Sequence, residues 1–400
     1  MLMTDTSRAA IHFILSWKSD GVCHQEHYFA PDVNMWRDIF PNELRKKLLG
    51  KRPGEEISHS FTADQIFLGN TENFVTLPLR HWRPATGEKP PPPPLPGRYY
   101  PQGFASGGLA GVFPQTLLPM RIVSVQGDTF TVDCNHPLSG RKIDITLKLK
   151  DIMPNRKERG GRCSDWLMDI LENGPGMQAR RQDCPMTLDR KKLRLRLDRQ
   201  DDRIFYAAPR MVSHIDSQAN AHLASVIATF LPPGCRVLDL MASVDSHLPA
   251  RHGLDVTGVG LNSEEMDANP DLARYAVHDL HADPVLPFSD GAFDAVLCSL
   301  SIEYLENPED VIRETARVLK PAGFLLISFS NRWFPQKVTK LWTELHEFER
   351  MGLVLQLCWP HYCNLRTISY RNWPRPSSDK YFPDIPTSDP LYIIAGQARS

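Results

Sequence analysis

The feature that most constrains the fold is the regular order of short apolar segments in residues 236–330. Four segments have the length of strands, at 235–240, 255–260, 293–299 and 323–329, and a shorter one lies at 274–278. Each is followed by a turn and usually by a helical segment. This order predicts a doubly wound α/β fold with a parallel sheet, which binds ligands at the carboxyl ends of its strands.

Helices with clear end signals accompany these strands. One has Leu223, Val226 and Ile227 on its apolar face, with Asp216 or Ser217 as its cap. The other, at 308–319, begins with a proline directly after an asparagine. The segment DPLYIIAG (389–396) is typical of a closing strand. We therefore expect an α/β domain over residues 206–400.

Residues 8–152 have a different pattern, in which apolar and polar residues alternate as they do in half-buried strands. Gly127-Asp128 separates two such runs and predicts a hairpin turn. One helix is expected within 41–50, with Leu44, Leu48 and Leu49 facing inward. These features predict an α+β domain with an antiparallel sheet. Residues 153–205 are polar and predict a connector.

The run KPPPPPLPG (89–97) interrupts this first domain and favours polyproline II. We favour a stiff spacer over a ligand for a proline-binding module, and both remain open.

Composition excludes some classes of partner and compartment. The chain has 400 residues and a formal net charge of -1, so no global field attracts nucleic acid or an anionic membrane. The N-terminal apolar run contains His12 and ends at Lys18, which is untypical of a signal peptide. Eight cysteines without CxxC pairs suggest free thiols and a cytoplasmic location. Cys358, His361 and Cys363 lack a fourth ligand nearby, so we expect no metal.

The ordered set RVLDLMAS, VTGVGLNSEE, HDL, LPFSDGAFDAVLCSLSIEYL and LKPAG resembles the class I (Rossmann-like) S-adenosylmethionine-dependent methyltransferases. The resemblance covers about 95 residues and implies S-adenosylmethionine as cofactor. In that family an acid and a glycine loop follow the first strand, and an acid that binds the ribose follows the second. After the third strand the family has an acid and an apolar residue that together bind the adenine. The implied cofactor-binding residues are Asp239, Met241, Ala242, Ser243, Gly260, Asn262, Asp279, Leu280 and Ser299.

Two positions depart from the family pattern. Met241-Ala242-Ser243 replaces Gly-x-Gly, so a left-handed turn there costs about 1 kcal/mol. Gly260 stands where the ribose-binding acid is usual, and Asn262, Glu264 or Glu265 would have to substitute.

Methyl transfer mainly requires orientation and exclusion of water, because the methyl group of a sulfonium is already activated. The acceptor pocket is expected at Ser299, Glu303, Tyr304, Asn331 and Trp333. Glu303 and Tyr304 are the candidate catalytic residues, with Glu303 as a base. A solvated carboxylate at a helix start is the alternative for Glu303.

Residues 129–149, with the hexad NHPLSG (135–140), resemble the flap and strand of SlyD-type prolyl isomerases, a branch of the FK506-binding fold. The stretch LLGKRPGEEISHSFTADQIF (48–67) resembles that family's helix end, turn and next strand. The resemblance covers most of 8–152 and implies an isomerase-like pocket at Phe67, Leu138 and Ile145, with proline-containing polypeptides as partners.

The sequence therefore predicts a methyltransferase acting on an unidentified protein or small molecule, fused to a prolyl-isomerase-like peptide-binding or chaperone domain. The alternative is an isomerase, chaperone or binding scaffold whose Rossmann-like domain is catalytically silent. We expect no membrane or nucleic-acid partner.

Overall fold

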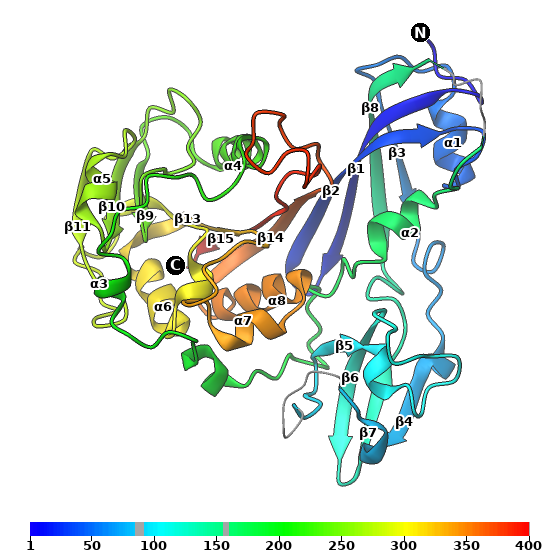
Figure 1. Ribbon diagram of the computed structural model, residues 1–400, viewed down its shortest axis with the longest axis horizontal. Coiled ribbons are helices and arrows are strands. Elements are labelled where there is room, and N and C mark those ends of the chain that lie inside the picture. Colours follow the sequence, from blue (N-terminus) through cyan, green and yellow to red (C-terminus); the bar gives the residue numbers. More distant parts are fainter. Residues whose placement is uncertain (85–91, 155–159, 400) are drawn as a thin grey trace. The chain divides into compact units, whose positions relative to one another are not determined.

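The computed structural model describes residues 1–84, 92–154 and 160–399. The chain divides into two compact units, Met1–Leu188 (unit 1) and Asp189–Ser400 (unit 2). Figure 1 shows their strands and helices.

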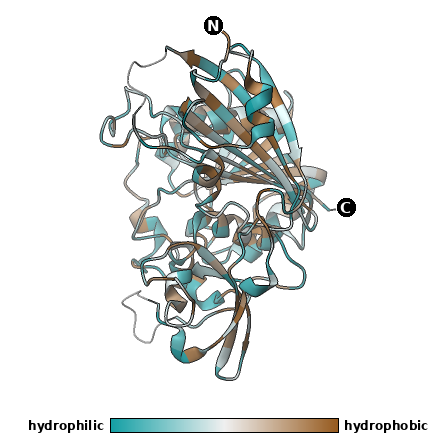
Figure 2. Ribbon diagram, turned by 90° about the vertical axis from the view of Figure 1, so that its right-hand side faces the viewer, coloured by the Kyte–Doolittle hydropathy of each residue, from teal (hydrophilic) through white to brown (hydrophobic). Residues whose placement is uncertain are grey.

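Unit 1 contains an antiparallel sheet in the order β2-β1-β8-β3. Its strands are β1 (Arg8–Ser19), β2 (Val22–Asn34), β3 (Glu56–Phe61) and β8 (Ile143–Met153). The alternation predicted for β1 is present, since Ile11, Phe13 and Leu15 are buried. The resulting apolar and polar stripes are visible in Figure 2. The helices α1 (Asn42–Leu48) and α2 (Trp166–Leu171) contribute buried residues to the core of this sheet.

A second antiparallel sheet is inserted between β3 and β8, in the order β4-β7-β6-β5. It comprises β4 (Phe74–Pro78), β5 (Tyr99–Pro101), β6 (Pro119–Gln126) and β7 (Thr129–Asp133), with the short helices η1 (Thr71–Asn73), η2 (Leu79–His81) and η3 (Gln102–Ala105). It has its own apolar core around Trp82, Met120 and Phe130. The hairpin predicted at Gly127-Asp128 joins β6 to β7. Of the proline run at 89–97, residues 89–91 lie outside the described residues.

Unit 2 contains the predicted sheet, in the order β11-β10-β9-β12-β13-β15-β14. The pairs from β11 to β13 are parallel, and β13-β15 and β15-β14 are antiparallel. The strands are β9 (Arg236–Leu240), β10 (Asp255–Gly260), β11 (Arg274–Val277), β12 (Phe293–Ser299), β13 (Leu319–Phe329), β14 (Tyr362–Arg371) and β15 (Leu391–Ala398). The helices are η4 (Arg190–Arg194), α3 (Asp202–Phe205), α4 (Ser217–Phe230), α5 (Ser263–Asp267), η5 (Ile302–Tyr304), α6 (Pro308–Val318), α7 (Lys340–Glu344) and α8 (Glu347–Cys358).

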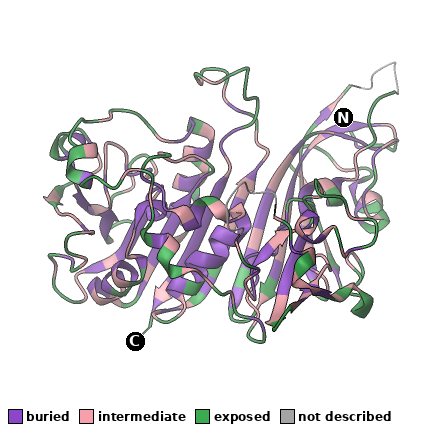
Figure 3. Ribbon diagram, turned by 60° about the horizontal axis from the view of Figure 1, so that its bottom comes forward, coloured by how far each residue is buried: buried purple, intermediate pink, exposed green. Residues whose placement is uncertain are grey.

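Helices cover both faces of this sheet, with α4 on one side and α6 and α8 on the other (Figure 1). Ala295 and Leu297 of β12 share a core with Leu223 and Ile227 of α4. Neighbouring strand residues point to opposite faces, so Val296 faces the α6 side. The strands are largely buried and the loops largely exposed (Figure 3). This arrangement confirms the predicted doubly wound α/β fold.

The boundary between the units differs from the predicted one. The segment 153–205 is no separate connector, because α2 packs into the core of unit 1 while residues 189–205 belong to unit 2. Leu49 is 43% exposed rather than inward, since α1 ends at Leu48. No helix among the described residues is long and apolar enough to cross a membrane.

Candidate functional site

A pocket opens at the carboxyl ends of β9, β10, β11 and β12, as the parallel sheet predicts. All the residues expected to bind a cofactor line it, and so does Tyr304. These residues are Asp239, Met241, Ala242, Ser243, Gly260, Asn262, Asp279, Leu280 and Ser299. Their strands place them together although they are spread over 61 positions of the sequence, from 239 to 299. Trp333 lines the pocket as well, whereas Asn331 does not.

The loop after β9 turns without glycine. Met241 adopts the left-handed conformation, with φ of 60°, at a cost of about 1–2 kcal/mol. The backbone N–H of Ala242 then donates to Val259 O of β10 at 2.7 Å. Ser243 Oγ donates to Glu265 Oε2 at 2.5 Å, which ties the loop to α5. The departure from Gly-x-Gly therefore leaves a formed loop that faces the pocket.

Asp239, at the end of β9, is 3% exposed. Burial raises the pKa of its carboxyl to about 7, although Ser246 Oγ donates a hydrogen bond to Oδ2 at 2.7 Å. Ser246 Oγ also accepts from Asn269 Nδ2 at 2.9 Å. Asp239 thus holds the loop after β9 through its contact with Ser246.

The position of the usual ribose-binding acid cannot carry a side chain. A Cβ on Gly260 would lie 2.4 Å from Ala242 O, far inside van der Waals contact. Among the possible substitutes, Glu264 is exposed and does not line the pocket. Asn262 caps α5 and donates to Tyr206 O at 2.8 Å, and Glu265 accepts from Ser243 and from Arg210 N.

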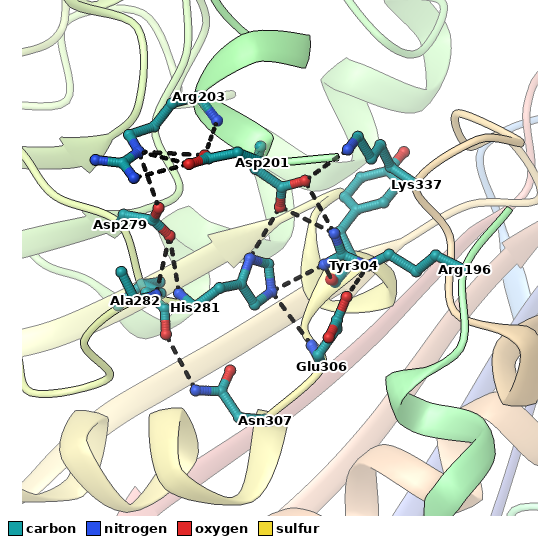
Figure 4. Close-up of polar contacts among 12 residues, drawn as sticks. Arg196, Asp201, Arg203, Asp279, His281, Ala282, Tyr304, Glu306, Asn307 and Lys337 are labelled. Carbon is teal, nitrogen blue, oxygen red and sulfur yellow. Dashed lines mark hydrogen bonds and ion pairs between the residues drawn. The ribbon is translucent and has the colours of Figure 1, made fainter. Parts of the chain in front are cut away.

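Asp279 and Leu280 follow β11 at the opposite end of the pocket. Asp279 Oδ1 accepts from the backbone N–H groups of His281 and Ala282 at 3.0 and 3.3 Å. Its Oδ2 lies 3.7 Å from Arg203 Nε. Figure 4 draws this contact as a dashed line. The carboxylate is therefore held in place at the pocket wall.

Sequence reasoning missed the segment before α4, which contributes Asp202, Tyr206, Arg210 and His214 to the pocket wall. Asp202 ties this segment down, because its carboxylate meets Arg196, His281 and Lys337 at 3.0, 2.9 and 2.9 Å. Figure 4 shows these three partners converging from separate segments. Burial disfavours the ionised form of Asp202, but these hydrogen bonds outweigh it and hold its pKa well below the usual range. The signal in the sequence was the aromatic pair Phe205-Tyr206 shortly before a helix.

The guanidinium of Arg210 lies over the rings of Phe205, Tyr206 and Phe334, at 4.5, 5.5 and 5.1 Å from their centroids. The ring of His214 meets Phe334 edge-on at 5.7 Å. Burial lowers the pKa of His214, so its imidazole is neutral at pH 7. Tyr304 Oη accepts from Phe334 N at 2.9 Å and keeps its own proton to donate. This part of the pocket is therefore aromatic, with a few polar groups.

Glu303 does not occupy the place expected of a base. It is 1% exposed, is absent from the pocket wall, and both its carboxyl oxygens lack a partner among the described residues. Burial raises its pKa to about 8, so the carboxyl is mostly protonated at pH 7. The expected solvated carboxylate does not fit either, because η5 carries the side chain into the core.

In unit 1, Leu138 and Ile145 are 1% and 0% exposed and belong to the core. Phe67 is partly exposed and stacks on His136 with the ring centroids 3.5 Å apart. Only Phe67 of the three expected pocket residues therefore offers surface to a ligand.

Residues 242–327 match the family model described as a methyltransferase domain. A ubiquinone biosynthesis O-methyltransferase of Xanthomonas campestris pv. campestris (strain B100) is 34% identical over 119 residues, which are 27% of this chain and 48% of that protein. A 2-methyl-6-phytyl-1,4-hydroquinone methyltransferase of Synechocystis is 31% identical over 111 residues, 26% of this chain and 34% of that protein. The chain thus spans about half the length or less of these relatives.

Among solved structures, the complex between the Haloferax volcanii Trm112 methyltransferase activator and the putative methyltransferase has a matching chain. The match covers 46% of this chain and 92% of that chain, at 18% identity and a TM-score of 0.35. The family match confirms the methyltransferase domain predicted within 206–400. The isomerase-like assignment of 8–152 stays a prediction.

Proposed function

We propose that the chain uses the methyltransferase domain of unit 2, with S-adenosylmethionine as its cofactor, to methylate an aromatic hydroxyl. The observation that carries the proposal is the pocket at the carboxyl ends of β9 to β12, to which every expected cofactor residue contributes. The aromatic part of the same pocket supports the choice of acceptor. The name of the relative from Xanthomonas campestris, an O-methyltransferase of ubiquinone biosynthesis, supports it as well.

The residues at one end of the pocket fit the adenine of the cofactor. Asp279 offers a carboxylate to an exocyclic amine, and the buried Leu280 offers an apolar contact beside it. At the amino-acid end, Ser243, His247 and Arg210 supply polar groups. The ribose end fits less well, because Gly260 replaces the acid and Glu265 is already engaged. A missing charge-assisted hydrogen bond costs about 1.5–3 kcal/mol, so we expect weaker binding than with the family acid.

The sulfonium supplies an activated methyl group, so the chain must orient the acceptor and exclude water. Tyr304 Oη can donate to an acceptor oxygen, since Phe334 N already occupies its acceptor side. The rings of Trp333, Phe334 and Tyr206 can hold an aromatic ring by stacking. The segment 202–214, tied down by Asp202, screens the pocket from water.

A hydroxyl acceptor must lose its proton, and His214 is the best placed group to accept it. The other histidines in the pocket wall are engaged: His247 with Asn220, His278 with Asp283 O, and His281 with Asp202. His214 has no hydrogen-bond partner among the described residues and is neutral at pH 7. A positioned base of this kind contributes about 10²- to 10⁴-fold in rate.

The test is release of S-adenosylhomocysteine from the full chain when phenols and catechols are added with S-adenosylmethionine. We expect turnover with a catechol, and a loss of about 100-fold in kcat for His214→Gln. Tyr304→Phe should cost about threefold to tenfold, the value of one hydrogen bond. Turnover only with amines or with proteins would contradict the proposed acceptor class.

For unit 1 we propose a second function, the binding of proline-containing polypeptides. The partly exposed Phe67 ring, held against His136 at the start of the NHPLSG turn, supports it. An isomerisation assay on a proline peptide, with Phe67→Ala as the variant, tests it. No effect of the chain on the isomerisation rate, together with no binding of the peptide, would overturn it.

A further inference from the structure

Two arginines line the pocket, and their surroundings differ. Arg332 Nη1 is paired with Asp389 Oδ2 at 3.0 Å. Arg210 forms no ion pair with any residue that the structure describes. Its Nη2 donates to Phe205 O at 3.1 Å, whereas Nη1 is shielded from solvent and has no partner in the described part of the chain. Arg210 is therefore a pocket cation that has no ion-pair partner in the described part of the chain.

The aromatic rings around Arg210 hold its guanidinium without neutralising it. Phe205, Tyr206 and Phe334 approach it within 4.5 to 5.5 Å of their centroids. Such contacts attract a cation but leave its N–H groups free in the ring plane of the guanidinium. A planar, bidentate anion is the ligand that this fork matches, and a carboxylate is the common one.

The backbone of Arg210 fixes which end of the pocket it serves. Arg210 N donates to Glu265 Oε1 at 2.7 Å, and Glu265 Oε2 accepts from Ser243 Oγ of the loop after β9. Asp279 follows β11, which is separated from β9 by β10. Neighbouring strands lie about 4.8 Å apart, so the two ends of the pocket are about 10 Å from each other. The backbone N–H of Arg210 thus lies on the side of the loop after β9, away from the adenine-binding acid.

We propose that Arg210 binds the carboxylate of the amino-acid end of S-adenosylmethionine. This inference rests on the proposed function and adds to it a residue for the carboxylate of the cofactor. The segment 202–214 then takes part in cofactor binding and does more than screen the pocket from water.

The experiment compares two probes by calorimetry on the full chain: S-adenosylhomocysteine, and 5′-methylthioadenosine, which lacks the amino-acid end. We expect Arg210→Gln to weaken binding of S-adenosylhomocysteine about tenfold to hundredfold and binding of 5′-methylthioadenosine less than twofold. Arg210→Lys, which keeps the charge but loses the fork, should fall between. The exposed Arg199 lies on the same part of the chain, so Arg199→Gln is the matched control and should change neither affinity.

Equal losses for the two probes would overturn the assignment, because they would mean that Arg210 only holds the segment 202–214 in place. Unchanged affinity for both probes would overturn it as well. Failure of the parent chain to bind either probe would instead contradict the proposed function itself.

Discussion

A Cβ placed on Gly260 would lie 2.4 Å from the carbonyl oxygen of Ala242. The loop after β9 therefore occupies the space in which the family's acid would stand. The two departures from the family pattern are linked, since the loop that lacks glycines and the glycine that lacks a side chain are in contact. Because Gly260 has no side chain, the turn Met241-Ala242-Ser243 can lie directly against β10.

From this contact we predict that restoring the acid does not improve the site. Gly260→Asp should weaken binding of S-adenosylhomocysteine at least tenfold, because the loop must move. Gly260→Ala should already destabilise the fold by about 1–3 kcal/mol, as overpacking does. Gly107→Ala, at a position with nothing within 4 Å, is the control and should leave the melting temperature unchanged. Tighter binding by Gly260→Asp would refute the linkage.

A second prediction concerns the ion cluster of Asp202. Lys337 is 0% exposed and meets this carboxylate at 2.9 Å, and Arg196 is 3% exposed and meets it at 3.0 Å. Asp202→Asn therefore removes a carboxylate from two buried cations and leaves Lys337 with Asp198, at 3.1 Å. The expected cost is about 3–5 kcal/mol in the free energy of unfolding. The exposed pair Arg317–Asp290 offers the contrast, and Asp290→Asn should cost about 0–1 kcal/mol. Denaturant titrations that gave the two variants the same stability would count against the buried cluster.

The pH dependence of this cluster follows from the sign of the shift. The pKa of Asp202 is lowered in the folded chain, so its contribution to stability is present above the ordinary aspartate pKa and is lost as the pH falls. The difference in stability between the parent chain and Asp202→Asn should therefore shrink below about pH 4. A constant difference between pH 7 and pH 3 would contradict the lowered pKa.

For Glu303 we expect the opposite dependence of the free energy of unfolding on pH. Its pKa is raised to about 8 when folded, so the folded chain keeps a proton that the unfolded chain releases above its ordinary pKa. Stability then falls as the pH rises from about 4.5 to 8, by up to about 1.4 kcal/mol per pH unit. Glu303→Gln removes this loss and should raise the melting temperature at pH 8 more than at pH 5. An equal effect at both pH values would show that Glu303 is ionised in the fold.

Much of unit 2 could be predicted from sequence because its signals are local. Strand lengths, the Asp216 cap of α4 and Pro308 at the start of α6 each depend on a few neighbouring residues, and all are present. The cofactor-binding residues followed, because the ends of parallel strands meet at one edge of the sheet.

Long-range contacts account for what could not be predicted. Arg210 acquires its place only when Phe334, more than 100 positions later, packs over it. Glu303 stands beside Tyr304 in the sequence, but η5 directs Tyr304 into the pocket and Glu303 into the core. The division between the units also depends on packing, because α2 and the segment 189–205 both lie within the stretch 153–205 but belong to different units.

We expect the pocket to bind the cofactor in spite of the altered loop after β9 and of Gly260 at the ribose position. Calorimetry with S-adenosylmethionine and S-adenosylhomocysteine on the full chain tests it most directly, with Asp279→Ala as the variant and Asp283→Ala, at an exposed position, as its control. We expect micromolar binding that Asp279→Ala abolishes and Asp283→Ala preserves. Absence of binding by the parent chain would contradict it and would favour a binding scaffold whose Rossmann-like domain is silent.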